Sequence, residues 1–215
     1  MALSAPSSGS VFAPMPSLGR LYLLFTPTAC RQDPFTTLTA ALDGGVDLVQ
    51  WRSKVEDLDG FRRCRELCRS RNVPLVVNDD VMLAKRSHVA GVHVGQTDMP
   101  AEVARKLVVN EWIGVSTHTP EQITAAAAAG ADYVGFGPCF PTATKGYTTG
   151  KTAAEVEAAV ERAAKVRLPL FAIGGITTAN LVPLRVLGVD RIAVSSAILQ
   201  ADDPRAAAVA LRRML

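Results

Sequence analysis

The chain has 215 residues, a formal net charge of +3, 48% hydrophobic residues and 20% charged residues. This length and balance favour one globular domain with a sizeable core, and the scattered Lys and Arg residues form no basic stripe of the kind that binds nucleic acid. No apolar run is long enough to span a bilayer and no secretory signal pattern opens the chain, so we expect a cytoplasmic protein with no nucleic-acid or membrane partner.

The first 18 residues are rich in Ala, Ser, Pro and Gly. They hold too little apolar surface to offset the entropy of ordering them, so we predict a flexible tail over 1–18 and a single catalytic domain over 19–215.

Short apolar runs then alternate with segments of helical spacing. Helical spacing or composition marks 35–42, 61–71, 121–129 and 153–164 among others. Parallel strands need crossover connections, which are usually helices, so this alternation predicts a parallel sheet covered on both faces. The predicted strands are 21–26, 48–51, 75–78, 91–94, 112–116, 133–137, 170–173 and 191–194.

A weak Gly-x-Asp repeat supports this division, because it recurs at 45–47, 130–132 and 188–190, each time between a helix and a strand. Glycine suits the end of a helix, where positive φ is common. Eight strand–helix units predict an α/β fold, a single (β/α)₈ TIM barrel. The alternative is an open doubly wound sheet, although no G-x-G-x-x-G follows the first strand.

In such a barrel the active site forms where the strands end, so polar residues there are candidates. Side chains alternate along a strand, and Gln50, Arg52 and Lys54 therefore project to one face. An amide and two cations suit a ligand with a polar ring and phosphates, whereas the simpler reading is an ordinary polar strand end.

Two aspartates follow consecutive strands. Asp79 follows the third strand and Asp98 follows the fourth, which brings them together at the mouth of a barrel. Two carboxylates suit Mg²⁺, which fills its other positions with water and phosphate. Each aspartate taken alone would more often be a helix cap or a turn residue, and we assign Asp80 to a helix N-terminus.

The next two strand ends offer hydroxyl, imidazole and ammonium groups. Ser116 could donate to a phosphate, while His118 has no partner for a nucleophilic triad and suits packing or hydrogen bonding. The connection from Pro138 to Lys151 carries Thr142, Thr144 and Lys145, which fit either a mobile phosphate clamp or a plain solvated loop.

The last two loops suit a phosphate. Gly174 and Gly175 follow the seventh strand, and Ser195 and Ser196 follow the eighth. Barrels often hold a phosphate at these loops through backbone N–H groups and a short helix. A double glycine is also a common turn.

Taken together, seven strings resemble those of thiamine phosphate synthases, in the same order from about Leu21 to Leu199. Trp51 and Ser53 depart from the usual pattern, which has another aromatic or aliphatic residue and Glu there; we expect both to face away from the mouth. The strings are 50–54 (QWRSK), 77–80 (VNDD), 91–100 (GVHVGQTDMP), 114–119 (GVSTHT), 130–138 (GADYVGFGP), 141–145 (PTATK) and 172–176 (AIGGI).

The resemblance implies condensation of hydroxymethylpyrimidine diphosphate with thiazole phosphate to give thiamine phosphate, by way of a pyrimidinylmethyl cation. It assigns the pyrimidine diphosphate to Gln50, Arg52, Lys54 and Asn78, with Mg²⁺ as cofactor on Asp79 and Asp98. It assigns further diphosphate contacts to Ser116 and Lys145, and the thiazole phosphate to Thr142, Thr144, Gly174, Gly175, Ser195 and Ser196. The catalytic set is thus Arg52, Lys54, Ser116 and Lys145.

Two other functions remain open. A thiazole tautomerase-like isomerase would use a histidine near strand five, where His118 lies, and a non-catalytic phosphate-binding barrel would need no Mg²⁺ pair. The sequence also leaves the oligomeric state open, a homo-oligomer included.

Overall fold

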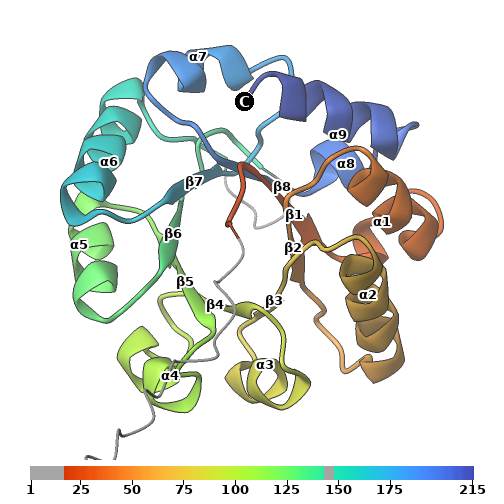
Figure 1. Cartoon of the computed structure of the whole chain (residues 1–215). Helices are drawn as coiled ribbons and strands as arrows, with labels where there is room; N and C mark the ends of the chain where they lie inside the picture. The colour runs from red at the N-terminus through yellow and green to blue at the C-terminus, as the bar shows by residue number, and fades with distance from the viewer. Residues whose placement is uncertain (1–16, 143–147) are drawn as a thin grey trace, which may run out of the picture.

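The computed structural model describes residues 17–142 and 148–215. Eight parallel strands close into a barrel in which each strand pairs with the next along the chain and β8 pairs with β1 (Figure 1). The predicted (β/α)₈ TIM barrel is confirmed. The strands are β1 (Leu21–Phe25), β2 (Leu48–Trp51), β3 (Leu75–Asn78), β4 (Gly91–Val94), β5 (Trp112–Thr117), β6 (Tyr133–Phe136), β7 (Leu170–Ile173) and β8 (Ile192–Val194).

Helices cover the outside of this ring (Figure 1). They are α1 (Pro34–Asp43), α2 (Leu58–Ser70), α3 (Val81–Ser87), α4 (Ala101–Leu107), α5 (Pro120–Ala128), α6 (Ala153–Val166), α7 (Leu181–Val186), α8 (Ser196–Leu199) and α9 (Pro204–Arg213), with a 3₁₀ turn at Pro27–Ala29. None of these described helices is long and apolar enough to cross a membrane. Of the predicted tail, only Ser17 and Leu18 are among the described residues.

Side chains with an oxygen acceptor begin several of these helices, as local chemistry dictates. Asp80 accepts from the N–H of Leu83 at the start of α3, which confirms its predicted place, and Thr119 accepts from Gln122 at the start of α5. At the other helix ends, the glycine of each Gly-x-Asp repeat has φ between +82° and +93°, as the repeat predicts. These caps mark where the helices begin and end, and so bound the connections that lead to and from the strands.

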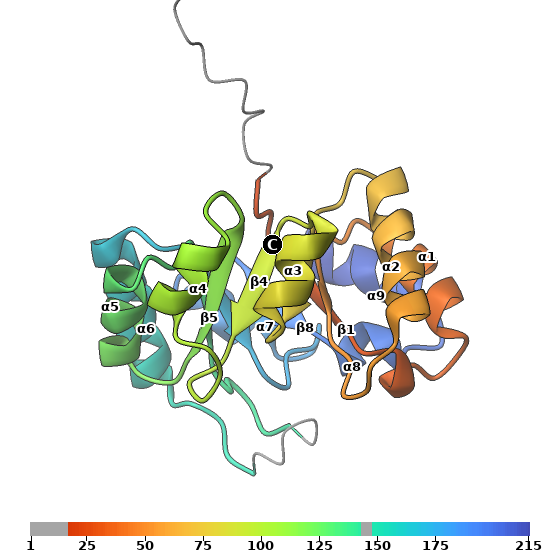
Figure 2. The ribbon, with the colours of Figure 1, turned by 90° about the horizontal axis from the view of Figure 1, so that it is seen from below.

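Alternation along the strands divides the core into two layers. Residues such as Leu23, Val49 and Val134 face the helices, whereas Tyr22, Tyr133 and Phe171 fill the barrel interior. In Figure 2 the described parts of the β6–α6 connection, 137–142 and 148–152, lie at the lower edge, which is the side on which the strands end. The loops on that side carry the predicted site.

The four cysteines are free thiols. Cys64 and Cys68 lie one turn apart on the buried face of α2, where burial raises the pKa of the Cys64 thiol. Among the residues that the structure describes, no group of three or more His, Cys, Asp or Glu side chains gathers as a metal cage. This pair is therefore part of the packing.

Candidate active site

Strand β2 presents two predicted site residues toward the barrel axis. Gln50 is only 2% exposed and its Nε2 donates to the Tyr22 hydroxyl over 2.7 Å. Arg52 follows the strand and lines a cavity at the mouth, and its backbone N–H donates to the Phe25 carbonyl over 2.9 Å. Between them Trp51 points outward against Phe25, as expected, with the ring centroids 5.9 Å apart.

The mouth cavity encloses about 790 Å³, its open entrance included. It gathers the ends of β2, β5, β7 and β8 and the connection after β6. Seven predicted site residues line it: Arg52, Ser116, Thr142, Gly174, Gly175, Ser195 and Ser196. Residues from four strand ends and one loop, distant in sequence, therefore share one chamber.

Lys54 and Asn78 line a second cavity beside the β2–α2 connection, of about 940 Å³ with its open side included. Lys54 lies beyond the end of the strand and is exposed, and Asn78 is the last residue of β3. Asp80 and Arg86 also line this space. Of the predicted pyrimidine-diphosphate residues, Arg52 and Ser116 thus line one cavity, and Lys54 and Asn78 line the other.

The two predicted metal ligands follow strands that pair directly, with Asn78 opposite His93. Asp79 has φ of +63°, donates its backbone N–H to the His93 carbonyl over 2.8 Å, and accepts from the Asn78 side-chain amide. Asp98 is exposed and its Oδ2 accepts from the Gly95 N–H over 2.7 Å. Two exposed carboxylates suit Mg²⁺, which completes its shell with water and phosphate oxygens.

His118 lines the mouth cavity and is held in place on two sides. Its Nδ1 lies 2.6 Å from the carbonyl oxygen of Gly137, which can only accept, so Nδ1 carries a proton. Its backbone N–H donates to the Gln122 side chain over 2.6 Å. These contacts suit the hydrogen-bonding role that the sequence suggests, and they join the ends of β5 and β6.

Backbone geometry explains the double glycine after β7. Gly174 and Gly175 have φ of +99° and +62°, a region that favours glycine. A Cβ on Gly174 would lie 2.6 Å from that of Pro138, and one on Gly175 would lie 2.5 Å from the carbonyl oxygen of Pro141. The glycines therefore let residues 138–141, which follow β6, lie directly over the end of β7. Ser195, across the cavity, donates to the Leu24 carbonyl over 3.2 Å.

Two predicted residues, Thr144 and Lys145, lie outside the described residues, and their assignment stays a prediction. Three others were missed by the sequence analysis as parts of the site. Tyr22, Tyr133 and His93 form a buried polar group beneath the cavity, between Gln50 and Ser116. The available signal was their position on the inward face of predicted strands, where polar side chains are unusual.

Comparison with known proteins assigns this geometry to a family. The model of the thiamine monophosphate synthase family matches residues 21–198. The chain is 39% identical over 203 residues to thiamine-phosphate synthase of Bacillus licheniformis, covering 91% of this chain and 90% of that protein. It is 42% identical over 181 residues to the enzyme of that name in Geobacillus kaustophilus, covering 81% of each.

A solved thiamine phosphate pyrophosphorylase of Pyrococcus furiosus superposes with a TM-score of 0.81 at 33% identity, covering 91% of this chain and 94% of that one. A 3-hexulose-6-phosphate synthase, with a TM-score of 0.68 at 16% identity, shares the fold alone. The family match and the two relatives agree with the seven sequence strings. The chain belongs to the thiamine monophosphate synthase family.

Proposed function

We propose that this chain is a Mg²⁺-dependent thiamine-phosphate synthase that condenses hydroxymethylpyrimidine diphosphate with thiazole phosphate. The reaction releases diphosphate and gives thiamine phosphate. The observation that carries the proposal is the shared mouth cavity, which has Arg52 and Ser116 on one side and the paired glycines and serines after β7 and β8 on another. One chamber thus offers separate groups for two phosphorylated substrates.

On the pyrimidine side, charge near the leaving group favours bond cleavage. Arg52 can bind diphosphate oxygens through its planar, permanently charged guanidinium, and Ser116 can donate a hydroxyl proton. Lys54, and Lys145 from outside the described residues, add positive charge. Asp79 and Asp98 would hold Mg²⁺, which when bound neutralises charge on the departing diphosphate.

On the thiazole side, the phosphate would lie against Gly174, Gly175, Ser195 and Ser196. The glycines present backbone without side chains, and the first N–H groups of α8 have no acceptor within that helix. Holding the two substrates in line in one chamber converts an encounter in solution into a reaction within a complex, which supplies much of the rate.

This chemistry needs no nucleophilic side chain, and the cysteine of the β6–α6 connection is unsuited to that role. Cys139 is buried, and burial raises its pKa to about 12. It is therefore a thiol at neutral pH, whereas the thiolate is the reactive form.

The test is an assay of the purified full chain with both substrates and Mg²⁺, followed for thiamine phosphate. We expect product, its loss on addition of EDTA, and a fall in kcat of at least ~100-fold in Asp98→Ala and in Arg52→Ala, since each removes a charge that stabilises the leaving group. Arg62→Ala, an exposed arginine on α2, is the matched control and should retain full activity.

Three other results of this assay would contradict part or all of the proposed function. Turnover that persists in EDTA contradicts the metal role of the aspartates. Absence of thiamine phosphate with an isomerised thiazole product favours the tautomerase-like function of a chain with His118 at its cavity, and binding of phosphates without any product favours a non-catalytic barrel.

A further inference from the structure

A continuous chain of polar side chains crosses the barrel interior beneath the mouth cavity. Gln50 Nε2 lies 2.7 Å from the Tyr22 hydroxyl, which lies 3.1 Å from the Tyr133 hydroxyl. The Tyr133 hydroxyl lies 3.3 Å from His93 Nδ1, and His93 Nε2 lies 3.0 Å from Ser116 Oγ. We call these five residues, from β2, β1, β6, β4 and β5, the interior relay. Of its two ends, Ser116 is a residue that the proposed function places on the pyrimidine substrate, and Gln50 is one that the family resemblance assigns to it.

The centre of the relay is closed to solvent, so its partners must come from within. Tyr22 is 1% exposed and Tyr133 is 0% exposed, and a buried hydroxyl without a partner is costly. Burial raises the pKa of both tyrosines, so each keeps its single proton at neutral pH. Each hydroxyl can therefore donate only one hydrogen bond.

This limit gives the relay a direction. The Gln50 nitrogen can only donate, so Tyr22 accepts from it. The buried Tyr22 proton also needs an acceptor, and we infer that Tyr22 donates it in a hydrogen bond to the Tyr133 oxygen. Tyr133 has then accepted and must donate to His93 Nδ1. With Nδ1 as an acceptor, His93 carries its proton on Nε2 and donates it to Ser116.

The two ends of the relay then differ in hydrogen-bonding role: Ser116 is left as a donor and Gln50 as an acceptor. Ser116 Oγ has accepted from His93, so its own proton is left to donate to an anionic oxygen. The Gln50 amide has used one N–H on Tyr22, so its carbonyl oxygen is left to accept from an amine. If every hydrogen bond of the relay ran the other way, Ser116 would donate to His93 and would present only lone pairs to an anion. The Gln50 side-chain amide would then have to rotate so that its oxygen accepts from Tyr22.

We propose that the interior relay is a positioning device, with Tyr133 as its central residue, that fixes His93 as the Nε2–H tautomer and so aligns Ser116 as a donor and Gln50 as an acceptor. This role rests on the proposed function, because that function supplies the diphosphate and the pyrimidine ring that these ends would meet. Tyr133 itself is a positioning residue, since it acts through its neighbours.

Strand β5 leaves space for the side chains of the relay. Gly114 lies in the middle of β5, and a Cβ there would overlap the rings of both Tyr133 and His93. At Gly135, by contrast, a Cβ would be 3.5 Å from the His93 ring, an ordinary contact. Glycine weakens a strand interior, so its presence at 114 is explained by the space that the Tyr133–His93 contact needs.

The first test reads the His93 tautomer directly, without any substrate. The chain has three histidines, so a sample labelled with ¹⁵N-histidine gives a simple spectrum, and His93→Gln assigns the signals. At neutral pH we expect the proton of His93 on Nε2 and a hydrogen-bonded, unprotonated Nδ1. A proton on Nδ1 would overturn the proposed direction.

Two conservative variants then separate the halves of the relay. Tyr133→Phe keeps the ring but removes the donor to His93, so the Nδ1 resonance should move to that of a nitrogen without a hydrogen bond. Tyr22→Phe leaves Tyr133 free to donate, so that resonance should stay in place. The control is Phe171→Leu, which alters packing against both tyrosines, at centroid distances of 5.2 and 5.6 Å, and removes no hydroxyl. An unmoved His93 Nδ1 resonance in Tyr133→Phe refutes the relay. If that variant does not fold, the spectra of the wild type and of Tyr22→Phe still test the direction of the relay.

A kinetic test links the relay to the substrate. For Tyr133→Phe we expect the KM for the pyrimidine diphosphate to rise about tenfold, as for one lost oriented hydrogen bond, with the KM for the thiazole phosphate unchanged. Equal increases in the two KM values would indicate that the whole site has become less ordered, and would contradict a positioning role for Tyr133. If the wild-type chain made no thiamine phosphate, the proposed function would be wrong. The NMR spectra would still test the hydrogen-bond direction of the relay, because they need no substrate.

Discussion

Asp79 has a backbone conformation that L-amino acids other than Asn and Asp rarely adopt. Its φ of +63° lies in the left-handed region, where the crowding of Cβ costs about 1–2 kcal/mol. The conformation is held by the hydrogen bond from its N–H to the His93 carbonyl, 2.8 Å long, which joins the ends of β3 and β4. Strain of this kind at a strand end of a barrel points to a functional role for the residue that carries it.

We therefore predict that Asp79→Gly separates stability from activity. Glycine relieves the left-handed conformation, so the free energy of unfolding should equal or exceed that of the wild type, by up to about 1 kcal/mol. The proposed metal ligand is lost at the same time, so kcat should fall at least ~100-fold. Urea titration and the thiamine phosphate assay measure the two quantities.

Arg167 provides the matched control, because it has φ of +59° at the end of α6, away from the mouth. Arg167→Gly should give a similar gain in stability with unchanged turnover. Full activity in Asp79→Gly would exclude this carboxylate from the reaction.

Sequence reasoning reached the residues that end strands but not those that meet across the barrel. Alternation in β2 is enough to place Gln50 and Arg52 on one face, because it is a local property. The contact between Tyr22 and Tyr133 joins residues 111 positions apart, and no spacing within one strand encodes it. The position of Lys54 beside a second cavity likewise depends on the path of the β2–α2 connection after the strand ends.

At the scale of the elements, the aspartate of the Gly-x-Asp repeat binds the start of the preceding strand. Asp47 accepts from the N–H groups of Arg20 and Leu21 at 2.8 and 2.9 Å, and Asp132 accepts from that of Ile113 at 2.7 Å. The third aspartate, Asp190, pairs instead with Arg191. Two of the three repeats thus fix where one strand begins beside the next.

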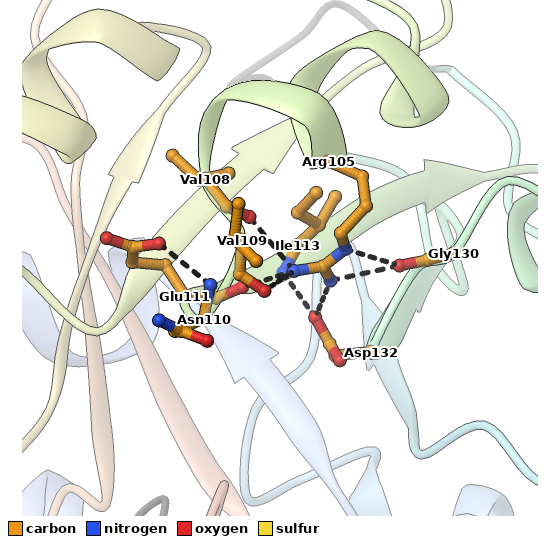
Figure 3. Close-up of polar contacts among 8 residues, drawn as sticks. All are labelled: Arg105, Val108, Val109, Asn110, Glu111, Ile113, Gly130 and Asp132. Atoms are coloured by element: carbon orange, nitrogen blue, oxygen red, sulfur yellow. Dashed lines mark hydrogen bonds and ion pairs between the residues drawn. The ribbon is translucent and has the colours of Figure 1, made fainter. Parts of the chain in front are cut away.

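Arg105 extends this arrangement around Asp132 (Figure 3). Its guanidinium donates to the carbonyl oxygens of Val108, Glu111 and Gly130 at 3.1, 2.8 and 3.0 Å, and it pairs with the Asp132 carboxylate. One side chain from α4 therefore holds both the α4–β5 and the α5–β6 connections.

We predict that Arg105→Met lowers the free energy of unfolding by about 1–3 kcal/mol, since it keeps the apolar stem but removes the donor that several carbonyls and the Asp132 carboxylate share. Chemical denaturation measures this loss. Arg62→Met is the control: Arg62 and its partner Asp59 have side chains 66% and 94% exposed, and such surface pairs contribute within about 1 kcal/mol. Equal losses in the two variants would contradict the role given to Arg105.

Element positions were largely predictable, because strands and caps depend on local sequence. Four of the eight strands have the predicted bounds and the others differ by one residue at an end. Helix α2 begins three residues before its predicted start, at Leu58, because Asp57 caps it by accepting from the Gly60 N–H. That aspartate follows Lys54 in a polar stretch, where apolar periodicity carries no signal.

For the whole molecule, the last helix completes the closure of the ring. The helix α9 packs beside α1, and Gly44 at the end of α1 allows the approach, since a Cβ there would be 2.7 Å from that of Ala208 (Figure 1). Beneath them β1 pairs with β8, the contact that joins the two ends of the sheet. The match to the family model ends at residue 198, so α9 lies beyond the matched segment. It nevertheless packs over the pairing of β1 with β8 that closes the barrel.

Leu211, on the buried face of α9, tests whether this closure is part of one cooperative unit. It is 1% exposed, so Leu211→Ala should cost about 2–5 kcal/mol of unfolding free energy, whereas Val186→Ala, at an 81% exposed position, should change it by less than about 0.5 kcal/mol. A closed sheet has no edge at which part of it can separate, so the variant should still unfold in one step, at lower urea and with an unchanged slope. Trp51 lies on the outward face of β2 and Trp112 lies inside the barrel, so tryptophan fluorescence and far-ultraviolet circular dichroism should report the same midpoint. A separate early transition in the dichroism alone would mean that α9 melts independently and that the ring stays closed without it.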